Sequence, residues 1–468
     1  MRMKTATWRR VIPIALAVLL VGAGRDQLSL IDAAKSGDKD ALRALLEQKT
    51  NINASEGDGS TALHWAAYKD ELEGADLLIR AGANVNAAND LGVTPLWMAS
   101  QNGSVAMVRR LLEAGANPNA PLLAGETPVM VASRAGYPEV VEQLLARGGN
   151  PNAHGARGQT ALMWAAAQKH PDVIKVLIAH GADLSARSDV WKEVMAVPPH
   201  GYLPYNAAIP QGGDTAFLFA VRAGDLDSAK LLVAAGANVN DASAWGVTAT
   251  AVAAHSGYRE VVEFLLDKGA DPNPGKAGFT ALHAAIMRRD EKMVTALLAH
   301  GADPNAPLQN WTPTRRASQD FNFPPSLVGA TPLWLAARYS QPNVMRLLEA
   351  SGADPLFVHH ADFVAGEAHT HRKDVATALM AALGMGGGGR AWVEPKRSER
   401  EALALDAVKL MTELGVDLNV IATDGRTALD AAKALKYETV VEFLTEHGAK
   451  PGSGKKAPSD DEEPVGGH

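Results

Sequence analysis

The sequence predicts an all-α solenoid of repeated helical hairpins, on two periodic signals and the composition. Thr61, Thr94, Thr127 and Thr160 are each 33 residues apart, and a glycine recurs with the same spacing from Gly82 onwards. A period of this length is typical of stacked repeats, in which each unit buries its apolar face against its neighbours. An apolar fraction of 47% with only 5% aromatic residues agrees with helices that pack closely through alanine and leucine.

Each repeated threonine precedes a short apolar segment, such as Thr94-Pro-Leu-Trp-Met-Ala-Ser100, which predicts the first helix of a unit. The threonine hydroxyl can accept a hydrogen bond from a free amide at the helix start, and proline suits the first turn because its nitrogen needs no acceptor. The second helix contains a Leu-Leu pair and is followed by Gly-Ala-Asp or Gly-Ala-Asn, as in Leu111 to Asn117. The glycine suits a left-handed residue just after the helix end.

These motifs resemble the ankyrin-repeat family, whose unit is a β-turn finger followed by two antiparallel helices. The threonine motif returns at Thr215, Thr248, Thr280, Thr331, Thr377 and Thr427. The resemblance covers nearly everything from about Leu28 to Lys450, which predicts an ankyrin-repeat domain at residues 25–450. It implies an α-solenoid of about eleven helix-turn-helix units with short β-turn fingers, if residues 28–54 form an N-terminal capping unit. The family's histidine three residues after the threonine remains only as His64 and His283, so apolar packing replaces its buried hydrogen bonds in most units.

The regular spacing fails in four places, which predicts insertions near 187–211, 307–328, 357–372 and 384–397. Insertions in a repeat array project as loops, often on the binding side. The first contains Trp191, Tyr202 and Tyr205 among prolines, and the second contains Trp311 with phenylalanines and prolines. Such loops predict ordered surfaces with a large contact area, although the rings could instead fold back to cap the adjacent repeats.

The third insertion concentrates histidines, namely His359, His360, His369 and His371, beside Asp362 and Glu367. Imidazole and carboxylate groups could together bind zinc, nickel or copper, and the competing interpretation is that these histidines are solvated or locally hydrogen-bonded. The local signatures of metalloproteases, serine hydrolases and thiol enzymes are missing from the sequence. We therefore expect no catalytic residue, no metal and no cofactor.

The fourth insertion and the C-terminus differ in composition from the repeats. A glycine run at 384–389 lies between two predicted helices, and Ser398 to Glu401 has the pattern of a capping box that restarts the second helix. Residues 451–468 are rich in glycine, serine, proline, lysine and acidic residues, which predicts a disordered tail.

Residues 1–24 have the pattern of a signal peptide. Four positive charges precede an apolar run at 11–21, and the small residues Gly22-Ala23-Gly24 follow. The alternative is an uncleaved N-terminal anchor. We expect an exported protein, in the periplasm or outside the cell, with no stable membrane insertion after cleavage. Cleavage would change the formal charge from -7 to -11, and an acidic protein is a poor partner for nucleic acid.

The chain has no cysteine, so after export its stability would depend on helix packing alone.

In the family that the sequence resembles, partners contact the finger tips before each threonine and the first helix seven or eight residues after it. Carried over to this chain, together with the aromatic residues of the first two insertions, this placement predicts a partner-binding set. Its members are Tyr68, Leu91, Arg134, Arg222, Trp245, His255, Phe279, Arg338, Tyr339, Trp191, Tyr202, Tyr205 and Trp311. Aromatic residues and arginine are favoured at interface centres, although Trp245 and Phe279 could pack against a neighbouring finger instead.

The sequence thus predicts a monomeric, non-enzymatic scaffold that binds a protein partner through its concave face, finger tips and aromatic insertions. Two alternatives remain open. One is a metal-dependent or catalytic role at the histidine-rich insertion, and the other is a secreted effector that acts on host proteins.

Overall fold

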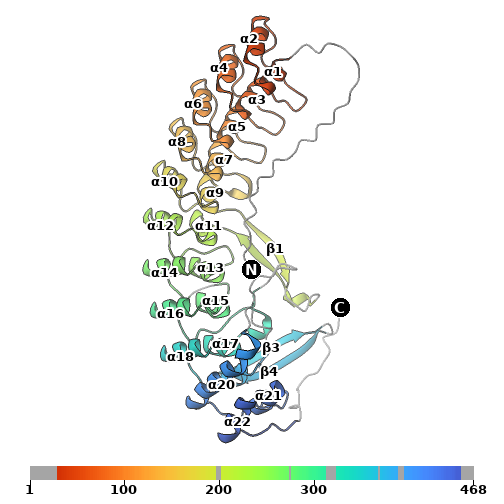
Figure 1. The fold of residues 1–468 in the computed structure, drawn as a ribbon, viewed down its shortest axis with the longest axis vertical. Coiled ribbons are helices and arrows are strands. Elements are labelled where there is room, and N and C mark those ends of the chain that lie inside the picture. The colour runs from red at the N-terminus through yellow and green to blue at the C-terminus, as the bar shows by residue number, and fades with distance from the viewer. Residues whose placement is uncertain are drawn as a thin grey trace.

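The computed structural model describes residues 29–196, 202–273, 276–312, 323–366, 369–387 and 395–454. Within these residues, eleven helical hairpins stack into one elongated, curved array (Figure 1). This architecture confirms the predicted all-α solenoid. The predicted signal peptide and residues 455–468 of the predicted tail lie outside the described residues.

The first helix of each unit lies on the concave side of the array and the second lies on the convex side (Figure 1). The first helices are α1 (Leu30–Ser36), α3 (Ala62–Tyr68), α5 (Pro95–Asn102), α7 (Pro128–Ala135), α9 (Ala161–Ala167), α11 (Ala216–Ala223), α13 (Ala249–Ser256), α15 (Ala281–Arg288), α17 (Pro332–Arg338), α19 (Ala378–Ala382) and α21 (Ala428–Leu435). The second helices are α2 (Lys39–Glu47), α4 (Leu72–Arg80), α6 (Val105–Glu113), α8 (Pro138–Ala146), α10 (Pro171–Ala179), α12 (Leu226–Ala234), α14 (Arg259–Asp267), α16 (Glu291–Ala299), α18 (Pro342–Ala350), α20 (Arg397–Glu413) and α22 (Glu438–Glu446).

The repeated threonines begin helices as predicted. The Thr94 hydroxyl accepts a hydrogen bond from the Trp97 N–H at 3.2 Å, and the other repeated threonines also occupy the N-cap position. Where the family's histidine is kept, His64 accepts the Thr61 N–H through Nδ1 at 3.1 Å, which completes a reciprocal cap. Gly115, after the second helix, has φ +88, so the predicted left-handed position is confirmed.

Asparagine side chains join consecutive units along their loops. Asn86 accepts the Asn117 N–H at 2.7 Å through Oδ1 and donates to the Gly115 carbonyl at 3.0 Å through Nδ2. These bonds satisfy loop backbone groups that helices leave unpaired. The same pair of bonds is made by Asn119, Asn152, Asn273, Asn305 and Asn419. The corresponding position holds Ser185 and Leu356 at the two places where a β-hairpin leaves the array.

One apolar core runs from the first unit to the last, from Leu30 to Ala449. Its largest fully buried side chains include Trp334, Phe217 and Phe323. Phe323 belongs to the second insertion, so part of that insertion folds back into the core. This agrees with the alternative interpretation, in which the aromatic rings of the insertion cap the adjacent repeats. Since each unit is buried against its neighbours, the stability of a unit depends on the units beside it.

Two insertions form antiparallel β-hairpins that were not predicted. The strand β1 (Val190–Ala196) pairs with β2 (Asn206–Gly212), with Trp191 opposite Gln211. The strand β3 (Val358–Ala365) pairs with β4 (Thr370–Thr377), with Val364 opposite His371. Both hairpins project from the concave side (Figure 1). They add to the helical fold without interrupting the stack.

The prediction of a capping box at Ser398 is wrong. The helix α20 already begins at Arg397, with Lys396 at the N-cap position and no side-chain cap, so Ser398 lies inside the first turn. The helix is 17 residues long, about twice the length of the other second helices.

Candidate functional site

The tips of the two hairpins meet far from the points where they leave the array. The Val364 N–H of β3 donates a hydrogen bond of 2.8 Å to the Tyr205 hydroxyl of the first insertion. Tyr202 packs edge-on against Tyr205, with 4.9 Å between ring centroids, and lies 5.7 Å from the His369 ring. Trp311 of the second insertion lies 6.1 Å from Tyr205. These five residues form a hairpin-tip cluster, in which burial raises the pKa of the Tyr205 hydroxyl.

A cleft of about 700 Å³ lies between the β1–β2 hairpin and the concave face of the units that follow it. It is lined by the fingers before α9, α13 and α15, by α11 and α13, by one side of the hairpin and by Thr312. Segments far apart in the sequence therefore enclose one site. Its size lies within the ~300–1,000 Å³ that is usual for ligand-binding clefts.

Aromatic side chains form the walls of the cleft. Trp191 comes from β1, Phe219 from α11 and Trp245 from the finger before α13, and all three are half-buried. Behind Trp245 lies Phe279, with 6.1 Å between ring centroids, and behind Phe279 lies Phe323 at 6.0 Å. Because Phe279 and Phe323 are buried in the core, their packing holds the Trp245 ring in place. The aromatic wall is thus anchored in the array.

The polar groups of the cleft are largely paired with one another. Arg222 donates two hydrogen bonds to the buried Asp214 carboxylate, at 2.7 and 3.2 Å. The Ser188 hydroxyl accepts the Asp214 N–H at 3.1 Å, which holds the hairpin base against α11. Arg157 differs, because its guanidinium lies 4.7 Å above the Trp191 ring and it has no carboxylate partner among the described residues.

The backbone of Arg157 is unusual as well. Its φ of +58° lies in the left-handed region, in which glycine is favoured, and the next residue, Gly158, also has a positive φ of +66°. This finger forms a short 3₁₀ turn at Ala156–Gly158. Arg157 is therefore held in an uncommon conformation at the edge of the cleft.

The structure brings together five of the predicted partner-binding residues in the cleft: Trp191, Arg222, Trp245, His255 and Phe279. Tyr202, Tyr205 and Trp311 lie in the hairpin-tip cluster instead. The expected exposure of Phe279 is wrong, because only 5% of its surface is exposed. It packs between Trp245 and Phe323, as the alternative interpretation of this residue proposed.

The expected exposure of Tyr339 is also wrong. Tyr339 is only 5% exposed, and burial raises the pKa of its hydroxyl to about 12. Leu383 and Gly384 of the following unit line the same depression as Tyr339. Its neighbour Arg338 is half-buried and donates to the Gly387 carbonyl at 3.1 Å.

Three predicted residues lie in the N-terminal half, away from the cleft. Tyr68 in α3 is 50% exposed, and Leu91 on the next finger is 64% exposed. Arg134 in α7 pairs with Glu126 at 2.7 Å and lies 5.5 Å from the Trp164 ring, so it is engaged within the array.

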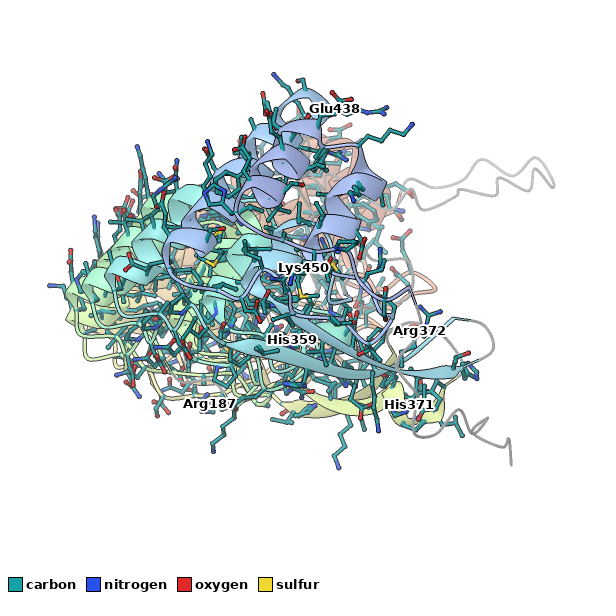
Figure 2. All side chains as sticks on the ribbon, turned by 90° about the horizontal axis from the view of Figure 1, so that it is seen from below. Arg187, His359, His371, Arg372, Glu438 and Lys450 are labelled. Atoms are coloured by element: carbon teal, nitrogen blue, oxygen red, sulfur yellow. The ribbon has the colours of Figure 1, made fainter. Side chains whose placement is uncertain are left out.

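The histidines of the third insertion are spread along a hairpin. His359 lies at its base, buried between the Ser326 carbonyl (3.1 Å) and the Trp334 ring (4.5 Å), and burial lowers its pKa. His371 lies near the other end, where Nε2 is 2.5 Å from the Asp362 carboxylate (Figure 2). No group of three or more potential metal ligands occurs within the described residues. The part of the hairpin that the structure describes therefore offers no metal centre.

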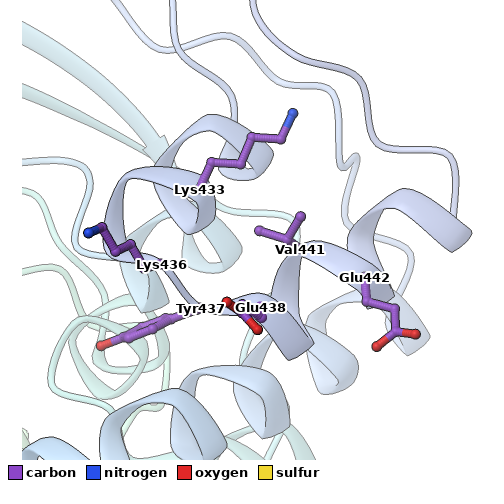
Figure 3. A pocket seen from close by; sticks show the side chains of 6 residues that line it. All are labelled: Lys433, Lys436, Tyr437, Glu438, Val441 and Glu442. Carbon is purple, nitrogen blue, oxygen red and sulfur yellow. The ribbon is translucent and has the colours of Figure 1, made fainter.

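A second depression, of about 430 Å³, lies over α21 and α22 (Figure 3). Lys433, Lys436, Glu438 and Glu442 surround it, but their charged ends point in different directions. The cleft beside the β1–β2 hairpin is a stronger candidate site, because its aromatic and polar groups converge and are held by the core.

Several residues of the cleft were missed as binding candidates. Asp214, Phe219 and Met195 line it, yet nothing in the repeat pattern distinguishes them from structural residues. Arg157 is different, because the repeat pattern does place it at a finger tip, where partners bind in this family. Its stacking on Trp191 depends on a hairpin that the repeat pattern does not predict.

Comparison with known proteins agrees with this architecture. The model for ankyrin repeats (3 copies) matches residues 30–122, 118–188, 217–308 and 275–359, and a second ankyrin model (many copies) matches residues 162–233. The chain therefore belongs to the ankyrin-repeat family. Ankyrin arrays generally mediate protein–protein interactions and are typically scaffolds rather than enzymes. Every helix in the described part of the chain is too short or too polar to cross a membrane.

The curated relatives match parts of the array. An ankyrin repeat-containing protein of Treponema pallidum (strain Nichols) is 40% identical over 103 residues, which is 21% of this chain and 35% of that protein. Myotrophin of Xenopus tropicalis is 44% identical over 59 residues, 13% of this chain and 50% of that protein. The mitochondrial disaggregase of Bos taurus is 30% identical over 152 residues, 25% of this chain and 22% of that protein. The chain spans half the length of these relatives or less.

Proposed function

We propose that this protein is a non-enzymatic scaffold that binds a segment of a protein partner in the cleft between the β1–β2 hairpin and the concave face. The observation that carries the proposal is the aromatic wall, in which Trp191 and Trp245 are half-exposed yet supported from the core. Rigid, half-buried aromatic side chains beside arginine have the composition of interface centres. An enzyme would instead need a nucleophile or a general base, and the polar groups that line the cleft are mostly engaged in structural pairs.

Affinity purification with matched variants tests this proposal. The double variant Trp191→Ala with Trp245→Ala should capture at least about tenfold less of the partner than the original chain, since central aromatic residues dominate binding energy. The control is Lys230→Ala, which changes an exposed residue on the convex helix α12. Circular dichroism checks that all proteins are folded. Equal recovery of the same partner by the double variant and the control would contradict the proposal.

We also propose that the protein acts after export, because residues 1–24 have the pattern of a signal peptide. The N-terminal sequence of protein recovered from cell fractions tests this. Export predicts a new N-terminus near residue 25 in the periplasm or the medium. An intact Met1 on protein that remains in the cytoplasm would contradict export.

A further inference from the structure

We propose that the cleft binds an extended, proline-containing segment that carries at least one carboxylate. This inference rests on the proposed function, because it specifies which kind of segment the same cleft accepts. It follows from the orientation of the hairpin, the free hydrogen-bond donors and the balance of charge.

The cleft faces one set of side chains of the hairpin and a short part of the β2 strand. Trp191 and Met195 are four residues apart on β1, and Gln211 pairs with Trp191 across the ladder. In a β-ladder, such residues share one face. All three line the cleft, as do Pro210 and Gly212 of β2. Pro210 has no N–H to donate, and the Gly212 carbonyl already accepts the Ala244 N–H at 3.0 Å. A bound segment is therefore recognised by packing against side chains and does not extend the sheet as a third strand.

The cleft presents hydrogen-bond donors beside aromatic faces. The indole N–H groups of Trp191 and Trp245 have no acceptor among the described residues. A polyproline II segment has no internal hydrogen bonds, so its carbonyl groups are free to accept from such donors. Its proline rings pack against aromatic side chains, which is how aromatic-lined grooves recognise proline-rich segments. The chemistry of the wall and that of such a segment are complementary.

The charge of the cleft favours an acidic ligand. Asp214 is the one carboxylate among the described residues that line the cleft, and Arg222 already neutralises it. Glu193 shares the face of β1 that bears Trp191 and Met195, but it does not line the cleft and interacts with another group. Arg157 contributes a positive charge at the cleft edge without an ion-pair partner in the described part of the chain. Asp189 is close in sequence to Trp191, but its contact with Arg157 is a backbone hydrogen bond of 2.8 Å to the carbonyl. A carboxylate on the bound segment would complete the pairing of Arg157.

The cleft and the proposed segment are both largely rigid before they bind. The wall is fixed by Phe279 and Phe323, and the far end of the hairpin is fixed by the Tyr205 contact with β3. A polyproline segment is also largely ordered before it binds. Binding then loses little conformational freedom, so a cleft of about 700 Å³ can hold a short segment with useful affinity.

Fluorescence anisotropy with three labelled synthetic peptides tests the proposal on the full chain. One peptide repeats Pro-Pro-Glu, the second has lysine in place of each glutamate, and the third has alanine in place of each proline. We expect the Pro-Pro-Glu peptide to bind most tightly. Trp245→Ala should weaken it at least about tenfold, and Trp245→Phe, which keeps a ring but removes the indole donor, should weaken it less. Arg157→Gln should reduce the preference for glutamate over lysine several-fold. The control Lys230→Ala, on the convex helix α12, should change nothing.

The position of binding can be read directly from the indole N–H resonances of the selectively labelled chain. Those of Trp191 and Trp245 should shift on addition of the Pro-Pro-Glu peptide, whereas that of Trp65, whose N–H already donates to Glu56 at 2.8 Å, should stay. Equal affinity for the alanine peptide would overturn the role of proline. Binding that is unaffected by Trp245→Ala would place the peptide elsewhere and overturn the site.

The two proposals fail in different ways. If the Trp191→Ala, Trp245→Ala variant loses its natural partner but the original chain binds no proline peptide, the cleft is the interface and only the ligand chemistry is wrong. If partner capture survives that variant, the proposed function itself is wrong.

Discussion

His283 makes the stability of the array depend on pH. It is completely buried in α15, where Nδ1 accepts the Thr280 N–H at 3.1 Å and the Phe323 ring lies 6.1 Å away. Its Nε2 makes no hydrogen bond within the described residues. Because burial penalises the charged imidazolium, it lowers the pKa of His283 to about 4. The side chain is therefore neutral in the folded protein at pH 7.

The sign of the pH dependence follows from comparison with the unfolded chain, in which a histidine has a pKa of about 6.5. Below that pH the unfolded chain binds a proton that the folded protein excludes, so the free energy of unfolding falls as the pH falls. The fall ends near pH 4, where the folded state also binds the proton. At about 1.4 kcal/mol per pKa unit, the full effect is roughly 3 kcal/mol, of which about 2 kcal/mol is reached at pH 5.

The variant His283→Met isolates this effect, because methionine occupies the same position in other units as Met130 and Met163. Urea denaturation at pH 7.5 and pH 5.0 should show that the original chain loses about 2 kcal/mol more than the variant. Repeat arrays can unfold in parts, so amide hydrogen exchange in α15 provides the local measurement. His154→Gln, on an exposed finger, is the control. An equal loss in the original chain and His283→Met, or a titration of His283 near pH 6.5, would refute the reasoning.

Three other substitutions test the packing of the array. Gly103→Ala would place a methyl group 2.7 Å from the Tyr137 ring, whereas Gly115→Ala meets no atom within 4 Å, and both positions have positive φ. Gly115→Ala should lower the free energy of unfolding by about 1–2 kcal/mol through backbone strain. Gly103→Ala should lower it by about 1–3 kcal/mol more, because the methyl group also displaces the Tyr137 ring. Equal melting temperatures of the two variants would contradict this. Trp334→Ala removes a fully buried ring whose N–H donates to the Ala376 carbonyl at 3.0 Å. The substitution should lower the free energy of unfolding by about 3–5 kcal/mol. An unchanged melting curve would disprove the packing role of Trp334.

The helical array could be predicted because its determinants are local and repeated. The threonine and glycine of each unit fix where helices begin and end, and the structure confirms both at Thr94 and Gly115. The asparagine ladder was harder to detect, since the role of Asn86 depends on its distance from the next unit. Even so, the sequence indicates where the ladder is interrupted. Ser185 and Leu356 replace the asparagine at the two places where a hairpin leaves the array.

The cleft was only partly predictable. Trp245 and Arg222 follow from repeat positions, but the same rule predicts exposure for Tyr339, which is buried. The hairpins could not be predicted from repeat periodicity because each occurs once. The bond between Tyr205 and Val364 joins residues 159 positions apart, and no local pattern records such a contact.

That contact also changes how the array behaves as a mechanical unit. In a simple solenoid each unit touches only its neighbours, so bending at any interface changes the distance between remote units. Here the hairpin-tip cluster joins the insertion after α10 to the insertion after α18 a second time, across the concave face (Figure 1). The units between them are held both by their stacking and by this bridge. The cleft lies beside one of the two joined hairpins, so the proposed partner would meet a surface that is held in place before binding.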